Sequence, residues 1–210
     1  MSTTLENLNW RYATKKFDAT KKVSEKDLET ILKAIQLSPS SYGLQPYHIL
    51  VVTDEALRKE LQPASWNQSQ IVDASHMLVF AAKSGFGDEL VDDYLENVSN
   101  TRGVDPENLK GYGDFMKSKL LDLPNEVKAA WTSRQTYIAA QSAMVAAAEL
   151  KIDTCPMEGF EPAKYDDILG LKDKGLTSVM VLTIGYRSEE DDTQNYPKVR
   201  KNNEELFTHI

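Results

Sequence analysis

A stretch of twenty residues, from Trp131 to Leu150, constrains the fold most, because it is almost uniformly apolar and helix-forming. It includes the alanine runs 139–140 and 146–148, and few charges interrupt it. Alanine has the highest helix propensity, and a helix that is apolar on all sides is stable only where all its sides are buried. We therefore predict a long helix that is buried nearly all round, either at the centre of the fold or in a subunit interface.

Shorter apolar segments predict a sheet that other helices cover. Ser24-Glu25-Lys26-Asp27 resembles a capping box, and the helix that it opens should end near Leu37, where turn residues begin. Period and length predict strands over 48–53, 77–82 and 178–186, and helices over 55–61, 90–98, 105–123 and 162–169. Since no repeat or change of composition divides the chain, we predict one α+β domain over residues 1–210, with a mixed sheet covered by helices.

Charge and cysteine content limit the partners and the compartment. The 210 residues include 24 basic and 32 acidic side chains, a formal net charge of −8, which argues against general nucleic-acid binding. The apolar runs are too short to cross a bilayer, and the polar N-terminus does not resemble a signal peptide. The single cysteine, Cys155, excludes an internal disulfide. We expect a cytoplasmic protein with no nucleic-acid partner and no membrane partner.

The usual catalytic motifs are absent, which narrows the function. The sequence contains no Gly-x-Gly-x-x-Gly, no Walker A motif and no Gly-x-Ser-x-Gly. The three histidines, at positions 48, 76 and 209, do not have metal-ligand spacing. A chain of this size without these groups either binds a ligand or takes its chemistry from a cofactor.

Basic residues gather near both chain ends, although the whole protein is acidic. Residues 1–22 carry a net charge of +3, and residues 196–203 again carry +3. Arg11 and Lys15 are four apart and would share one face of a helix or turn, while Lys198 and Arg200 alternate and would point the same way in an extended chain. Both pairs suit a phosphate, so the two ends could build one anion site. The alternative is two solvated clusters of charge.

Two loops add candidate ligand contacts. The loop 38–46 carries hydroxyls, amides and Gly43 between a helix and a strand, and its alternative role is that of a simple linker. In Pro156-Met-Glu-Gly-Phe160, Gly159 lets the backbone approach a flat ligand closely.

Together these segments resemble the FMN-dependent, oxygen-insensitive NAD(P)H nitroreductases, specifically the branch of dihydropteridine reductase-type nitroreductases and flavin reductases. The resemblance runs over nearly the whole chain, and the order and spacing of its markers make it specific. The markers are 11–17, Leu37-Ser-Pro-Ser-Ser41 with Gln45-Pro46, Asn67, Asp73-Ala-Ser-His76, Pro156-Met-Glu-Gly159, Gly175-Leu-Thr-Ser178, Ile184-Gly-Tyr186 and Pro197-Lys-Val-Arg200.

The resemblance implies an α+β sandwich that forms an intertwined homodimer, with FMN at the interface and touched by both subunits. In that picture the helix from Trp131 to Leu150 lies in the subunit interface. The C-terminal arm would cross to the partner and add a strand there.

The resemblance also implies a set of FMN contacts. Arg11, Lys15, Lys198 and Arg200 would hold the phosphate and ribityl end or the pyrimidine edge. Tyr12 and Ala13 stand where relatives often carry His and Ser, and Gly43 and Gln70 stand where relatives carry Asn and Lys. The remaining implied contacts are Ser40 and Ser41 from the other subunit, then Asn67, Gln135 and Pro156, and the backbone N–H groups of Glu158 and Gly159 near flavin N5.

The implied activity is a ping-pong reaction in which NADPH or NADH reduces the flavin and an acceptor then takes two electrons. Nitroaromatics, quinones, free flavins and pteridines are the implied small-molecule acceptors. No protein acid or base is required, and Phe115 and Tyr42 are expected on the substrate side. Two alternatives stay open: a non-enzymatic FMN-binding or flavin-carrier protein on the same scaffold, and an acidic ligand-binding module with only a fold-level likeness.

Overall fold

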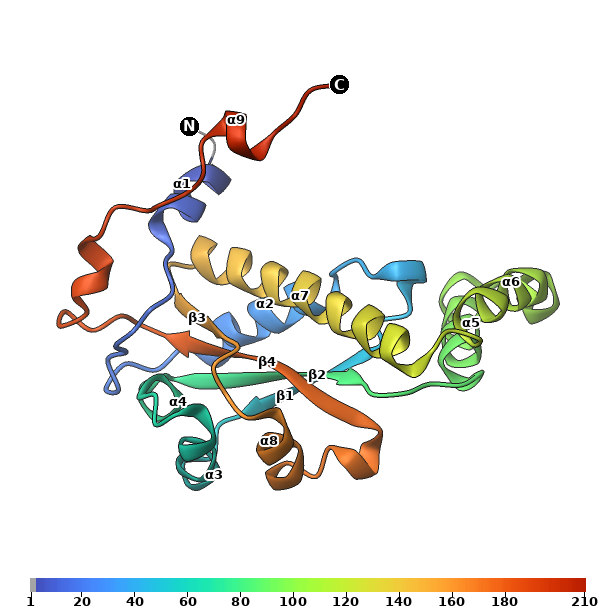
Figure 1. Cartoon of the computed structure of the whole chain (residues 1–210), viewed down its shortest axis with the longest axis horizontal. Helices are drawn as coiled ribbons and strands as arrows, with labels where there is room; N and C mark the ends of the chain where they lie inside the picture. The colour runs from blue at the N-terminus through green and yellow to red at the C-terminus, as the bar shows by residue number, and fades with distance from the viewer. Residues whose placement is uncertain (1–2) are drawn as a thin grey trace.

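The computed structural model describes residues 3–210 and contains a four-stranded sheet with helices on both faces (Figure 1). The strand order is β1 (Tyr47–Val52), β2 (His76–Lys83), β4 (Leu176–Gly185) and β3 (Asp153–Met157). All three neighbouring pairs are antiparallel. The α+β class is therefore confirmed.

Two details of the predicted sheet are wrong for this chain. The sheet is not mixed, since the parallel contact between Ala13 and Thr154 is an isolated bridge outside the strands. In addition, β3 was not predicted. After β4, the part of the chain that the structure describes forms no further strand, so the strand added to a partner by the C-terminal arm stays a prediction.

Helices α2 (Glu25–Gln36) and α7 (Asn125–Glu149) cover one face of the sheet. The Oγ of Ser24 accepts a hydrogen bond from the backbone N–H of Asp27 at 3.1 Å, as the capping box predicts. Alternate residues of β2, including Leu78 and Phe80, point into this layer and pack against Ile31 and the buried alanines of α7. The small alanine side chains let α7 lie close to the sheet.

The long helix differs from its prediction in two ways. It begins at Asn125, six residues before Trp131. It is also not buried all round in one chain, because Arg134, Tyr137, Ile138 and Gln141 form an exposed stripe at helical spacing.

The second face of the sheet carries three short helices, α3 (Glu55–Leu61), α4 (Gln70–Asp73) and α8 (Pro162–Ile168). Met77 and Val79, the other alternate residues of β2, pack there against Tyr165. Strand β2 is therefore buried on both faces, and this explains its continuous apolar run.

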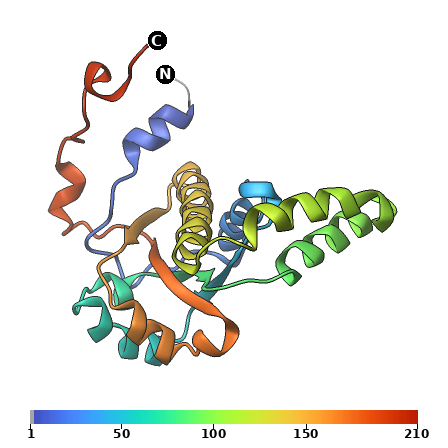
Figure 2. The same cartoon turned by 45° about the vertical axis from the view of Figure 1, so that its right-hand side comes forward.

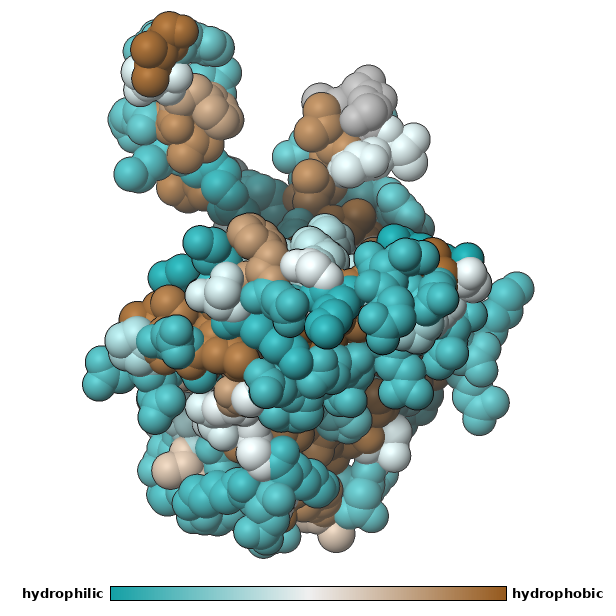
Figure 3. All heavy atoms as spheres, turned by 90° about the vertical axis from the view of Figure 1, so that its right-hand side faces the viewer, coloured by the Kyte–Doolittle hydropathy of each residue, from teal (hydrophilic) through white to brown (hydrophobic). Residues whose placement is uncertain are grey.

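Two pairs of segments extend beyond the sheet and its helices. Helices α5 (Glu89–Arg102) and α6 (Lys110–Leu120) form a hairpin at one end (Figure 2). Helix α1 (Thr3–Trp10) and the C-terminal segment with α9 (Asn203–Leu206) project on the opposite side. Figure 3 shows these two chain ends as separate protrusions, the C-terminal one bearing hydrophobic side chains.

The remaining elements are short 3-10 helices. They are η1 (Ser41–Gly43), η2 (Pro63–Ser65), η3 (Pro106–Leu109), η4 (Lys172–Lys174) and η5 (Asp192–Asn195). Within residues 3–210, no helix combines the length and apolarity that crossing a membrane requires.

Candidate functional site

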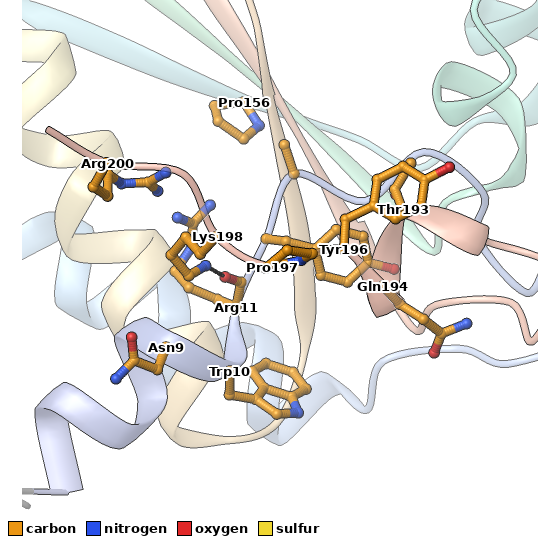
Figure 4. A pocket seen from close by; sticks show the side chains of 12 residues that line it. Asn9, Trp10, Arg11, Pro156, Thr193, Gln194, Tyr196, Pro197, Lys198 and Arg200 are labelled. Carbon is orange, nitrogen blue, oxygen red and sulfur yellow. Dashed lines mark hydrogen bonds between the residues drawn. The ribbon is translucent and has the colours of Figure 1, made fainter.

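The two basic chain ends meet around one cavity of about 420 Å³ (Figure 4). The segment after α1 forms one side, and the segment after η5 forms the other. The predicted residues that line it are Arg11, Tyr12, Ala13, Pro156, Lys198 and Arg200. The structure therefore brings these six predicted residues together from three separate segments of the chain, at 11–13, 156 and 198–200.

Three cations face this cavity without a carboxylate partner. None of the ion pairs among residues 3–210 involves Arg11, Lys198 or Arg200. Burial, and then the charge of Arg200, lowers the pKa of Arg11. Burial lowers the pKa of Lys198, and the neighbouring charges of Arg11 and Arg200 lower it further. Both pKa values are lowered in part because like charges lie close together, and an anion between them would relieve this repulsion.

A buried polar atom without a hydrogen-bond partner also indicates that an anion binds in this cavity. In the described residues, Arg11 Nε and Thr14 Oγ1 are the buried side-chain polar atoms that make no hydrogen bond. A buried donor without an acceptor costs roughly 1–3 kcal/mol, so an acceptor group is expected beside Arg11. A phosphate dianion fits both this donor and the three charges.

The backbone explains how these cations come to share the cavity. Helix α1 ends at Trp10, so Arg11 and Lys15 do not lie on a helix, the first of the two predicted forms; Ala13 between them bridges to Thr154 in β3. The segment 198–200 has no regular secondary structure. Its two cations line the cavity while Val199 between them is 83% exposed, in agreement with the predicted alternation. The ammonium of Lys198 also donates to the carbonyl of Arg11.

Sequence reasoning missed Asp191, which ties the two ends together. The hydroxyl of Tyr12 donates to Asp191 Oδ2 at 2.9 Å. The Tyr12 ring lies 4.6 Å from the guanidinium of Arg187, which also stacks on Trp10 and forms an ion pair with Asp153 at 2.6 Å. The Tyr12 side chain is therefore occupied with the protein, and burial followed by the Asp191 hydrogen bond raises its pKa.

A second, mostly apolar cavity of about 430 Å³ lies between α7 and β3 and shares Pro156 with the first. Its other lining residues are Tyr137, Ala140, Met144, Met157, Glu158 and Met180. Tyr137 donates to Glu158 Oε1 at 2.7 Å; burial and this bond raise the pKa of Tyr137 to about 12. The mostly apolar lining suits an apolar group beside the charged cavity.

An aromatic residue that was not predicted lies next to Gly159. Trp66 is 66% exposed, and a Cβ added to Gly159 would lie 2.9 Å from its ring. Gln68 Nε2 donates to the carbonyl of Gly159 at 2.8 Å. Trp66 and the predicted Asn67 have left-handed φ angles of 55° and 56°, which turns this loop toward the Gly159 segment. The available sequence clue was a tryptophan among polar residues, three positions after Pro63.

Gln70 and Lys15 lie near Cys155. Gln70 is buried in α4, and burial raises the pKa of Cys155, an effect that Lys15, Gln70 and Arg11 partly offset. Lys15 is exposed, so its side chain is accessible.

The predicted residues of the loop 40–43 form a separate group. The backbone N–H of Ser41 donates to Gln135 Oε1 at 2.8 Å, and Ser40 Oγ accepts from the N–H of Gln45. Gly43 has φ +78°, and its missing Cβ would lie 3.1 Å from the ring of Tyr94 in α5.

The two groups are separated along α7. Arg11 contacts Met144, whereas Ser41 contacts Gln135 nine residues earlier, which is roughly 13 Å along a helix. Tyr42 packs with the cluster of α5 and α6, and Phe115 projects from α6, 48% exposed. One chain therefore does not bring Tyr42 and Phe115 to the charged cavity. Among the described residues, no group of His, Cys, Asp and Glu could hold a metal ion.

The chain is similar in sequence and in fold to known proteins. The model of the nitroreductase family matches residues 8–186. A Staphylococcus epidermidis protein provisionally named an NAD(P)H nitroreductase is 37% identical over 99% of this chain and 97% of its own length. The oxygen-insensitive NAD(P)H nitroreductase of Enterobacter cloacae is 32% identical over 90% of this chain and 91% of its own. A crystal structure from Exiguobacterium sibiricum, in complex with FMN, superposes with a TM-score of 0.85 at 22% identity, covering 100% of this chain and 98% of that one.

Proposed function

The chain belongs to the nitroreductase family, and on that premise we propose that it is an FMN-dependent oxidoreductase that uses NADPH or NADH. The observation that carries the proposal is the meeting of Arg11, Lys198 and Arg200 around one cavity, with a buried Arg11 donor that lacks an acceptor. Named relatives use NAD(P)H, and a neighbour of the same fold contains FMN, which supports the same cofactor here.

The residues of this chain fit the parts of FMN. Arg11, Lys198 and Arg200 would bind the phosphate through charge-assisted hydrogen bonds. The apolar cavity lined by Met144 and Met157 would take the ring. In the described chain, no turn or loop hydrogen bond uses the N–H of Glu158 or Gly159, which leaves these groups to donate to the ring edge.

Two-electron transfer from a reduced nicotinamide to an acceptor is the chemistry that FMN supplies when bound. Lys15 would keep a positive charge near the ring, and Asn67 would bond its edge. Trp66, exposed beside Gly159, offers a surface on which a planar acceptor can stack. We propose that nicotinamide and acceptor occupy this place in turn, with ping-pong kinetics, and that nitroaromatics, quinones, flavins or pteridines accept the electrons.

We propose that the enzyme is a homodimer in which the loop 40–43 completes the site of the partner. The exposed stripe on α7 with Tyr137 and Ile138 supports this, because apolar side chains on such a face are suited to a subunit interface. The separation of Ser41 from the charged cavity supports it as well.

Anaerobic titration of the FMN-reconstituted protein with NADPH, and separately with NADH, tests the proposal. Loss of the visible flavin absorbance, and its return on addition of menadione, is the expected result. A protein that binds FMN but does not bleach with either nucleotide would be the non-enzymatic flavin carrier. A protein that takes up no FMN would contradict both functions.

A further inference from the structure

Asp191 is unexpected where it lies, because it is acidic and stands beside a cavity that cations line and that is suited to an anion. Its side chain is 2% exposed, and no ion pair of residues 3–210 includes it. Placed near an anion site, a carboxylate weakens anion binding by Coulomb repulsion. Its burial therefore needs another physical reason.

The hydrogen bonds of Asp191 supply that reason. One oxygen, Oδ2, accepts from the hydroxyl of Tyr12 at 2.9 Å and from the backbone N–H groups of Lys15 at 2.7 Å and Lys16 at 3.1 Å. The other oxygen, Oδ1, accepts from the N–H of Thr193 at 3.1 Å and from its hydroxyl at 2.5 Å. A single carboxylate thus satisfies five donors, three near the N-terminus and two near the C-terminus.

These donors lie in the segments that carry the cations. Tyr12 directly follows Arg11, and Asp191 begins the 3-10 turn that leads to Lys198. The two segments are joined again by the backbone bond from Ser188 N to Lys16 O at 2.9 Å. Fixing one segment against the other sets the spacing between Arg11 and Lys198.

From this geometry we infer that Asp191 is a positioning residue, which holds the two basic segments at the spacing that binds the phosphate of FMN. The inference rests on the proposed function, because it concerns the same cavity. It predicts that removing a negative charge here weakens the binding of an anion, which is the opposite of the Coulomb effect.

The test compares Asp191→Asn with Asp192→Asn, a matched control. Asp192 is the next residue, is exposed, and its replacement changes the charge by the same amount. The dissociation constants of FMN and of riboflavin, which lacks the phosphate, are measured by calorimetry in phosphate-free buffer at several NaCl concentrations. The ratio of the two constants isolates the contribution of the phosphate, which a general loss of stability would not change selectively.

We expect Asp191→Asn to reduce the preference for FMN over riboflavin about tenfold or more and to flatten the dependence of FMN affinity on salt. Asp192→Asn should leave the preference unchanged or raise it. Tyr12→Phe keeps the ring on Arg187 and removes the hydroxyl that donates to Asp191, so it should reduce the preference for FMN over riboflavin roughly twofold to tenfold. This variant takes the place of Asp191→Asn in the test if Asp191→Asn does not fold.

Two results separate the inference from the proposed function. A wild-type protein that does not bind FMN contradicts the proposed function. If the wild type prefers FMN and Asp191→Asn shows the same preference and salt dependence, the positioning role is overturned and the proposed function stays intact. If Asp191→Asn does not fold, the same comparison is made with Tyr12→Phe.

Discussion

The cavity between the chain ends and the loop 40–43 are built in different ways. The cavity is closed within one chain, by bonds from Tyr12, Lys15 and Lys16 to Asp191 across more than 170 positions. The loop has positive φ angles at two of its four residues and is held to α7 by a single hydrogen bond, which the N–H of Ser41 donates to Gln135 Oε1.

The difference indicates which half of the proposed site one chain completes by itself. Three cations, one of which has a buried donor without an acceptor, already line the charged cavity. The loop 40–43 lies roughly 13 Å away along α7, a helix whose exposed stripe includes the apolar side chains of Tyr137 and Ile138. Phosphate binding should therefore depend on one chain, and binding of the ring on two.

The largest effect is expected from removing a cation of the cavity. Lys198→Met should raise the dissociation constant of FMN between tenfold and about 150-fold, because a charge-assisted hydrogen bond contributes roughly 1.5–3 kcal/mol. Flavin fluorescence titration measures it. Lys201→Met is the matched control, since Lys201 is exposed and does not line the cavity; equal losses in the two variants would contradict a specific phosphate site.

Mixing two defective variants tests whether the site is shared between chains. Gln135→Leu removes the acceptor of the Ser41 N–H, which loosens the loop, whereas Lys198→Met damages the charged cavity. Random exchange of subunits makes half of the dimers mixed, and one of the two sites in each mixed dimer would carry neither defect. We expect about a quarter of the tight FMN sites to return on mixing. If subunits are shown to exchange but no tight FMN sites return, the charged cavity and the loop 40–43 would belong to one site within one chain.

The pH dependence of stability should depend on Asp191. Burial alone would raise the pKa of Asp191, but hydrogen bonds from Thr193, Lys15, Lys16 and Tyr12 lower it from 3.8 to about 2. A folded-state pKa below the unfolded value adds stability that is complete above about pH 4 and is lost as the pH falls toward 2.

Urea unfolding of the wild type and of Asp191→Asn across this range measures that contribution. The wild type should be more stable by roughly 2 kcal/mol at pH 7, and the difference should shrink toward pH 2. Asp192→Asn should show no such trend. A difference that stays constant with pH would contradict the assigned hydrogen bonds.

The smallest effect concerns the loop 40–43. Gly43→Ala places a side chain at φ +78° and 3.1 Å from Tyr94, so it should lower the free energy of unfolding by about 1–2 kcal/mol. Gly170→Ala is the control, because Gly170 has φ +60° and open space around it. Thermal unfolding should show the larger loss in Gly43→Ala; equal losses would mean that Tyr94 moves aside freely.

Much of the fold could be predicted, because period and capping are local properties. The helix 55–61 agrees with α3, and the capped helix agrees with α2. Strand β3 was missed because it is short and contains Pro156, whose missing N–H is tolerated only because β3 is an edge strand. The start of α7 was placed too late, since its first turn is polar.

The candidate site could be predicted only in part. Alternating cations at 198 and 200 in an extended chain are visible in the sequence, and the structure places both in the cavity. Asp191 was missed because it stands in the acidic run 189–192, in which no local pattern distinguishes the buried carboxylate from its exposed neighbours. Its partners are distant in sequence, so only tertiary structure identifies it.

A crystal structure of the FMN-reconstituted protein tests the central claim most directly. The account predicts the phosphate within hydrogen-bond distance of Arg11, Lys198 and Arg200 of one chain, with the ring extending toward Ser41 of a second chain. A phosphate bound elsewhere, with the three cations still facing solvent, would contradict it.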